Sequence, residues 1–123
     1  MPKTKPLISV VDDDESMREA VRGLMKSLGY TAEAFASAEE FLSSRQVART
    51  SCLIADVQMP GMTGLELYRH LVASGKTIPT ILITAYPDNS VRERALADGV
   101  VGYLSKPFDE NDLLACIHSS LDI

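Results

Sequence analysis

Short apolar runs alternate along the chain with stretches in which apolar residues recur at helical spacing. The runs are rich in β-branched residues and end at polar or turn-forming positions, a pattern typical of buried strands. They lie at residues 7–11, 31–36, 52–55, 80–84 and 102–105. The pattern therefore predicts five strands, of which the second is the least apolar.

The stretches between and after these runs predict five helices. The clearest carries apolar or small side chains on one helical face, at Met17, Ala20, Val21, Leu24, Met25 and Leu28. The second is short, and Ser37 with Glu40 forms the pattern of a capping box at its start. The third follows the turn-rich segment 59–64, and Asp88 and Asp109 are suited to cap the last two.

Strict alternation of strands and helices predicts an α/β fold, with a parallel sheet covered by helices on both faces. Right-handed crossovers leave few arrangements. Five βα pairs in 123 residues fit a (βα)5 flavodoxin-like, doubly wound parallel sheet of strand order 2-1-3-4-5. A barrel would need about twice this length. The chain is expected to form a single domain over residues 1–123, with its core at about 5–121.

The charge balance limits the partners of such a domain. Twelve Lys and Arg residues oppose seventeen Asp and Glu residues, which gives a net charge of −5. Nucleic acids and anionic membranes attract a basic face, so neither is expected to bind this domain directly. Cys52 and Cys116 form no metal-binding or disulfide pattern, which favours buried thiols and a cytoplasmic location.

Polar side chains of complementary chemistry follow four of the predicted strands. Asp12 and Asp13 come after the first strand, Asp56 after the third, Thr84 ends the fourth and Lys106 follows the fifth. In a doubly wound sheet the carboxyl ends of the strands surround the ligand site, at the switch point between strands one and three. The sequence therefore predicts one site where three carboxylates, a hydroxyl and an ammonium group meet.

This combination points to a magnesium ion and a phosphoryl group. Clustered carboxylates resist ionisation unless a cation is present. Mg²⁺ takes one or two carboxylates together with waters and phosphate oxygens, and a lysine suits a phosphate oxygen as a point charge. An aspartate is also a competent nucleophile toward phosphorus. Each element alone is ordinary, since acids favour the first turn of helices, and the inference depends on their joint occurrence.

Over residues 5–121 the sequence resembles the receiver domain of bacterial two-component response regulators, which has the CheY-like fold. The matching motifs are Val10-Val11-Asp12-Asp13, Asp56-Val57-Gln58-Met59-Pro60-Gly61-Met62-Thr63-Gly64, Ile83-Thr84-Ala85 and Lys106-Pro107-Phe108. Segments 37–42 and 102–108 are similar to those of FixJ-type transcription regulators. The resemblance implies a regulator that catalyses only its own phosphoryl transfer and dephosphorylation, not an enzyme with an external substrate.

The resemblance also implies roles for individual acids. Asp56 is the expected phosphoacceptor. Asp13, Asp56 and the backbone carbonyl of Gln58 are the expected Mg²⁺ ligands, while Asp12 acts through a metal-bound water. Asp14 is expected to cap a helix rather than to bind the metal.

By the same resemblance, Lys106 pairs with the phosphoryl group and Thr84 hydrogen-bonds it. Tyr103 matches the aromatic switch residue of the family and turns inward when Thr84 moves. The donor is a sensor histidine kinase. The output surface is the fourth helix, fifth strand and fifth helix, about residues 90–121, through which phosphorylation promotes homodimerisation or effector contact.

The function of the whole protein is open to several interpretations. The first is a switch with a transcriptional output, whose C-terminal DNA-binding effector domain is absent from this chain. The second is a stand-alone receiver or phosphorelay shuttle that acts by protein binding. A phosphatase would need an acid where Gln58 stands, and a flavin-binding domain would need a Ser/Thr/Gly-rich loop where the chain has Asp12 and Asp13.

Overall fold

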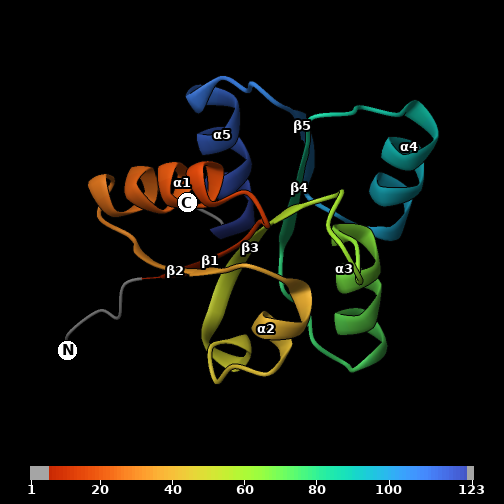
Figure 1. Ribbon diagram of the computed structural model, residues 1–123, viewed down its shortest axis with the longest axis horizontal. Coiled ribbons are helices and arrows are strands. Elements are labelled where there is room, and N and C mark those ends of the chain that lie inside the picture. Colours follow the sequence, from red (N-terminus) through yellow and green to blue (C-terminus); the bar gives the residue numbers. More distant parts are fainter. Residues whose placement is uncertain (1–5, 122–123) are drawn as a thin grey trace.

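The computed structural model describes residues 6–121, which form a parallel sheet covered by helices on both faces (Figure 1). The strands are β1 (Leu7–Val11), β2 (Thr31–Phe35), β3 (Thr50–Asp56), β4 (Thr80–Thr84) and β5 (Gly102–Ser105). Their order is β2-β1-β3-β4-β5, so the predicted fold class and strand order are confirmed. Residues 1–5 and 122–123 lie outside the described part, and with them the first residue of the predicted core.

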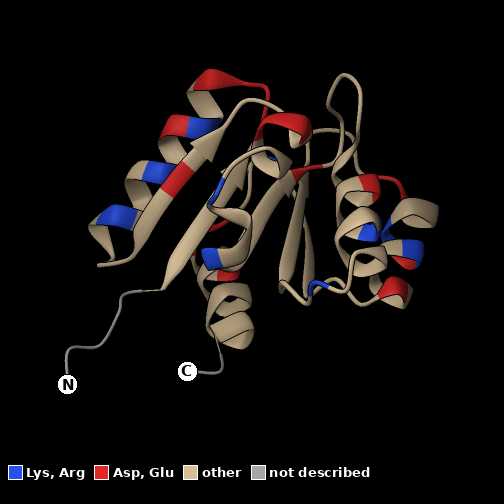
Figure 2. Ribbon diagram, turned by 90° about the horizontal axis from the view of Figure 1, so that it is seen from below, with Lys and Arg blue, Asp and Glu red and all other residues tan. Residues whose placement is uncertain are grey.

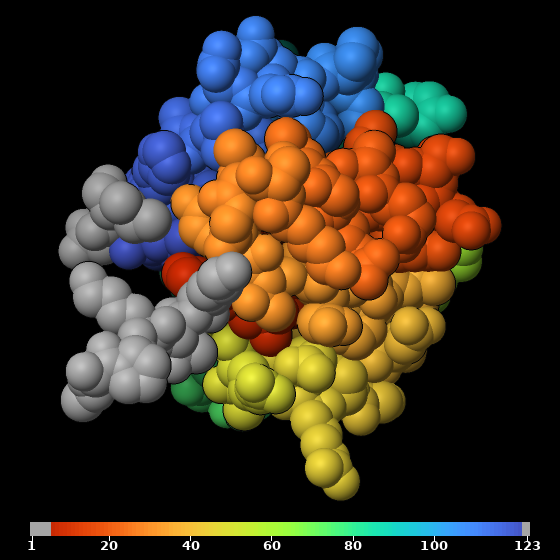
Figure 3. Space-filling view, turned by 90° about the vertical axis from the view of Figure 1, so that its left-hand side faces the viewer, coloured from red at the N-terminus to blue at the C-terminus, as the bar shows by residue number. Residues whose placement is uncertain are grey.

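The α-helices of the described part are α1 (Glu15–Ser27), α2 (Ala38–Leu42), α3 (Gly64–Ala73), α4 (Asn89–Asp98) and α5 (Glu110–Leu121). Helices α1 and α5 cover one face of the sheet and lie side by side, as Figures 1 and 3 show, while α2, α3 and α4 cover the other. Among residues 6–121, none of these helices has the length and apolar character needed to span a bilayer.

Each face of the sheet has its own apolar core. On one face, Val21 of α1 and Ile117 of α5 pack on the strands. On the other, Phe41 of α2, Leu71 of α3 and Ala95 of α4 do the same. Strands β1 and β4 are buried along their whole length, which is why they read as continuous apolar runs. The two cores hold the sheet in place, and the functional residues lie at one edge of it.

Side-chain caps begin the helices largely where the sequence predicts them. Asp14, Asp88 and Asp109 accept hydrogen bonds from backbone N–H groups at the starts of α1, α4 and α5. At α2, Ser37 accepts one from the N–H of Glu40 (3.0 Å), which is half of the predicted capping box. The acids placed early in these helices therefore have a structural role in addition to any role in binding.

A complete capping box opens α3, where the sequence predicts only a turn. The Thr63 hydroxyl accepts from the N–H of Glu66 (3.2 Å), and the Glu66 carboxylate accepts from the N–H of Thr63 (2.9 Å). The neighbouring loop is also held from α2, because Glu39 accepts from the N–H of Met62 (3.1 Å). These contacts fix the segment between the third strand and α3.

Strand β3 begins two residues before its predicted start. A hydroxyl pair, Ser9 Oγ and Thr50 Oγ1 at 2.7 Å, joins its first residue to β1. Positions 50 and 51 are polar and gave no apolar signal. Both cysteines are free thiols, and burial raises the pKa of Cys52 to about 11, so it remains protonated and packs as a small apolar side chain.

Candidate functional site

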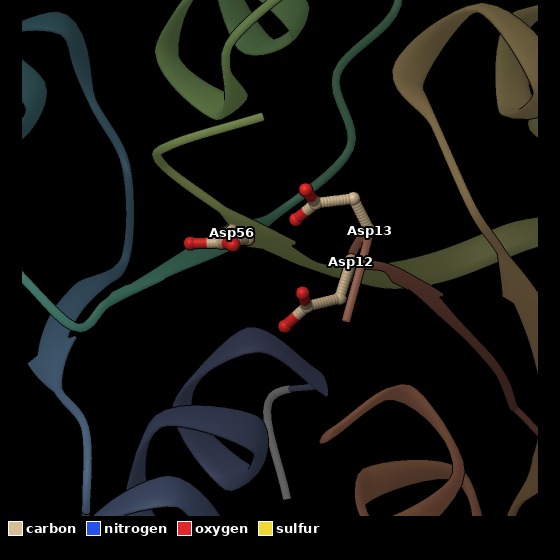
Figure 4. A group of neighbouring side chains, drawn as sticks. All are labelled: Asp12, Asp13 and Asp56. Carbon is tan, nitrogen blue, oxygen red and sulfur yellow. The ribbon is translucent and has the colours of Figure 1, made fainter. Parts of the chain in front are cut away.

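Asp12, Asp13 and Asp56 gather at the carboxyl ends of β1 and β3 (Figure 4). The two strands pair in parallel with Val11 beside Ala55, so the carboxyl ends of the two strands meet. One carboxylate oxygen from each acid lies within 4.8 Å of the other two. The acidic cluster is thus formed at the predicted switch point of the sheet.

Asp12 is the most constrained of the three acids. Its side chain is fully buried, and its Oδ1 accepts a hydrogen bond from the N–H of Asp14 (2.9 Å). Its backbone carbonyl accepts another from the Arg18 guanidinium (2.9 Å). Asp13 is exposed, and acidic residues also mark the start of α1 at this end of the molecule (Figure 2). One acid is therefore held inside while its neighbour faces solvent.

Lys106 brings a positive charge into the cluster from the end of β5. Its Nζ lies 3.1 Å from Asp12 Oδ2 and 3.5 Å from Asp56 Oδ2, and its side chain is only 13% exposed. Burial alone would lower its pKa, but the hydrogen bond and charge of Asp12, together with the charge of Asp56, raise it. The lysine therefore stays charged and is shared between two carboxylates.

The surroundings of Asp56 disfavour its ionised form. The pKa of Asp56 is raised to about 6; burial is the largest cause and the negative charge of Asp12 adds to it, while Lys106 and the N–H of Gln58 act in the opposite direction. One ammonium group thus fails to balance the acids around it. A second cation would restore the balance, and it is this excess of negative charge that makes the pocket attractive to a metal ion.

The donor set fits a hard divalent cation. Asp12, Asp13 and Asp56 offer carboxylate oxygens, the ligands that Mg²⁺ prefers, and they come from two strand ends rather than from a closed cage. The backbone of Gln58 borders the same pocket, since its N–H donates to Asp56 Oδ1 (3.3 Å).

Gly64 brings the start of α3 against the backbone of Asp56. A Cβ on Gly64 would lie 2.5 Å from the Asp56 carbonyl oxygen and 3.1 Å from Leu82, so no larger residue fits without displacing the strand end. Its N–H also bonds to the carbonyl of Val57 (3.2 Å). The close approach fixes the position of Asp56 in the pocket.

Thr84 ends β4 with its side chain fully buried. Its hydroxyl donates a hydrogen bond to the side-chain Oε1 of Gln58 and accepts one from the N–H of Tyr86 (2.9 Å). The side chain of Gln58 thus reaches the threonine, while its N–H reaches Asp56. The sequence predicts a role only for the backbone carbonyl of Gln58, and the side-chain bridge to Thr84 is not visible in it because the bridge depends on the bend of the backbone at Val57 and Gln58.

Tyr103 lies apart from the acidic cluster. It is half-buried on β5 and pairs in register with Leu82 of β4. Its hydroxyl accepts a hydrogen bond from the N–H of Asp88 (3.2 Å), at the start of α4. This hydrogen bond joins Tyr103 to the start of α4 rather than to Thr84.

The fold and the arrangement of acids, lysine and threonine define the receiver class, and sequence comparison agrees. The family model described as the response regulator receiver domain matches residues 8–118, and the chain belongs to this family. Nodulation protein W of Bradyrhizobium diazoefficiens is 41% identical over 114 residues, which cover 93% of this chain and 50% of that protein.

Transcriptional regulators are among the relatives. The transcriptional regulatory protein FixJ of Azorhizobium caulinodans is 35% identical over 121 residues, 98% of this chain and 57% of that protein, which confirms the predicted resemblance. The solved structure of the response regulator StyR is 42% identical with a TM-score of 0.89, and the match covers 97% of this chain and 60% of that one. The chain spans about half the length of the curated relatives it matches.

Proposed function

We propose that this chain is the phosphorylation-controlled part of a response regulator, in which Asp56 accepts a phosphoryl group from a phosphohistidine of a sensor histidine kinase. The proposal rests on the surroundings of one carboxylate. Asp56 is 5% exposed, lies 3.5 Å from the Lys106 ammonium and shares its pocket with Asp12 and Asp13. A nucleophilic carboxylate beside a fixed cation is suited to attack a phosphorus atom that carries anionic oxygens.

In the proposed step, an oxygen of Asp56 attacks the phosphorus in line. The new O–P bond forms as the P–N bond to the histidine breaks, and the electron pair of that bond goes to the imidazole nitrogen. Lys106 pairs with a phosphoryl oxygen. Asp12, held by Lys106 and the N–H of Asp14, keeps the lysine aimed at the transferred group. The protein thus catalyses only its own modification and its hydrolytic reversal.

Mg²⁺ is the proposed cofactor. Asp13, Asp56 and the backbone carbonyl of Gln58 would hold the ion, with Asp12 acting through a bound water. When bound, the ion supplies positive charge that offsets repulsion between the acids and the phosphoryl oxygens. The all-oxygen donor set and the raised pKa of Asp56 support this assignment.

The proposed output is a change at α4, β5 and α5. Thr84 hydrogen-bonds the phosphoryl group, and Tyr103 leaves Asp88 and turns inward. The altered surface then promotes homodimerisation or contact with a C-terminal DNA-binding effector domain, in a cytoplasmic protein. Two facts support a transcriptional output: FixJ of Azorhizobium caulinodans is named a transcriptional regulatory protein, and the chain covers 57% of the length of that protein.

Phosphorylation by a small donor tests the proposal. The protein is incubated with Mg²⁺ and acetyl phosphate, and its intact mass is measured. We expect a phosphate-sized increase in the wild type, none in Asp56→Asn and none with a chelator present. No increase in the wild type, or an undiminished one in Asp56→Asn, would contradict the assignment of Asp56.

A further inference from the structure

The side chain of Gln58 joins the two residues on which phosphorylation is proposed to act. Its backbone N–H donates to Asp56 Oδ1 at 3.3 Å, and its side-chain Oε1 accepts a hydrogen bond from the Thr84 hydroxyl. Residues 56 and 84 end neighbouring strands, β3 and β4, and Gln58 spans the gap between them. Its backbone thus lies at the acidic cluster, whereas its side chain reaches Thr84.

The hydroxyl of Thr84 has one proton, and that proton is already in use. The oxygen accepts from the N–H of Tyr86 (2.9 Å) and donates to Gln58. Thr84 is fully buried, so water does not readily replace either partner. For the hydroxyl to donate to a phosphoryl oxygen on Asp56, its bond to Gln58 has to break.

Gln58 is well placed to release the hydroxyl. Its side chain is exposed, so a freed amide regains hydrogen bonds from water. It also borders a cavity of about 360 Å³ between α3 and α4, whose walls include Glu66, Val91 and Arg94. The freed side chain therefore has both solvent and polar partners within reach, which keeps the free energy of release small.

We propose that the Gln58 amide acts as a latch, which means that it stabilises the unphosphorylated state. This inference rests on the proposed phosphorylation of Asp56. By accepting the Thr84 hydroxyl it competes with the phosphoryl group for the same proton. It thereby lowers the affinity of the pocket for a phosphoryl anion and holds Thr84 in its unphosphorylated position. Gln58 is thus a positioning residue that acts through Thr84.

The test measures binding of beryllofluoride, an anion that mimics the phosphoryl group, in the presence of Mg²⁺. The backbone amide resonance of residue 84, present in every variant, reports the bound state in a titration of the whole chain. Gln58→Met keeps the side-chain length and removes the acceptor oxygen. We expect the titration midpoint to fall about 3- to 10-fold, the ratio that one hydrogen bond of ordinary strength represents.

Two further variants separate the hydrogen bond from the bulk or polarity of the side chain. Gln58→Asn keeps the amide but shortens the reach by one methylene, so its midpoint is expected to fall as in Gln58→Met. Thr84→Ala removes the donor, and in that background Gln58→Met is expected to change the midpoint by less than 2-fold. Thermal unfolding checks that each variant folds, which the exposed position of Gln58 favours.

An unchanged or higher midpoint in Gln58→Met would overturn the latch, as would the same gain in the Thr84→Ala background. A wild-type midpoint in Gln58→Asn would also overturn it, since polarity rather than reach would then set the affinity. A separate result bears on the proposed function. If wild type does not bind beryllofluoride, or Asp56→Asn binds it equally well, the assignment of Asp56 fails and the latch fails with it.

Discussion

Different kinds of contact hold the two sides of the site at the carboxyl ends of the strands. On the β1 side, Asp12 is fully buried, and its two carboxylate oxygens accept from the Asp14 N–H and from Lys106. On the β4 side, Thr84 is tied to Gln58, whose side chain is exposed. The contacts on the β1 side hold the charged groups in fixed positions. On the β4 side, Thr84 can exchange its hydrogen bond to Gln58 for one to another partner without disturbing the core.

Helix α4 extends this contrast. Of the residues of this helix only Ala95 is buried, and the ends of the helix are held by polar contacts. At its start the Asp88 N–H donates to Tyr103 (3.2 Å), and at its end Asp98 accepts from Tyr68 (3.2 Å) and pairs with Arg69 (2.6 Å). An element held by a few weak contacts is one that a local change can shift.

The largest effect is expected when Lys106, the cation beside Asp12, is replaced. Lys106→Met leaves the buried carboxylate of Asp12 without its ion-pair partner, which lowers the free energy of unfolding by about 3 kcal/mol. Urea unfolding in the presence of a chelator measures this change. Lys26→Met is the matched control, because Lys26 is exposed in α1. Equal stability of the two variants would show that the Lys106 contacts contribute nothing to the fold.

A smaller loss is expected where α3 approaches the strand end. In Gly64→Ala the new Cβ meets the Asp56 carbonyl, and the overpacking lowers the free energy of unfolding by about 2 kcal/mol. Gly23→Ala is the control, since a Cβ there has no atom within 4 Å and alanine favours the helix. The two substitutions should change the thermal midpoint in opposite directions, and a shift of the same sign would contradict the argument.

Removal of the negative charge of Asp56 is expected to raise the free energy of unfolding. Because the pKa of Asp56 is raised to about 6, the folded state binds a proton more tightly than the unfolded state does. The contribution of Asp56 to wild-type stability therefore falls as pH rises from about 4 to about 6 and is constant above. Without Mg²⁺, Asp56→Asn should be more stable by about 1 to 2 kcal/mol at pH 8, since one pKa unit is about 1.4 kcal/mol and solvent screens part of the effect.

Chemical unfolding at several pH values measures the difference between wild type and Asp56→Asn. The gain should vanish below about pH 4 and shrink when Mg²⁺ is added. Asp88→Asn is the control of opposite sign, because hydrogen bonds from Ser90 lower the pKa of Asp88. A constant difference between wild type and Asp56→Asn across this pH range would contradict the assigned cause.

The smallest change in stability is expected on the α4 side. Arg69→Ala removes an exposed ion pair, so the free energy of unfolding should fall by about 0.5 kcal/mol or less. Arg22→Ala removes a comparable exposed pair within α1 and serves as control. Although both variants are nearly as stable as wild type, only Arg69→Ala should speed hydrogen exchange of the α4 amides. Equal exchange in both would show that Arg69 does not hold α4.

Much of the fold was predictable because it depends on local patterns. The apolar runs of β1, β4 and β5 match their predicted bounds, and the strand order follows from alternation and handedness. The start of β3 was not predictable, because the Ser9–Thr50 pair joins positions 41 residues apart. The residue types of a capping box are present at Thr63 and Glu66. They were not recognised as a helix cap, because the neighbouring glycines and proline indicate a turn.

For the site, the sequence by itself determined which groups meet. Parallel strands end at one edge of a sheet, so the order of the chain places Asp12, Asp13, Asp56, Thr84 and Lys106 together whatever the side chains do. Only the tertiary structure decided their individual environments: the complete burial of Asp12, the exposure of Asp13 and the bond between Gln58 and Thr84. The physical reason is that strand ends are positioned by the backbone, whereas burial and hydrogen-bond partners depend on packing between residues distant in the chain.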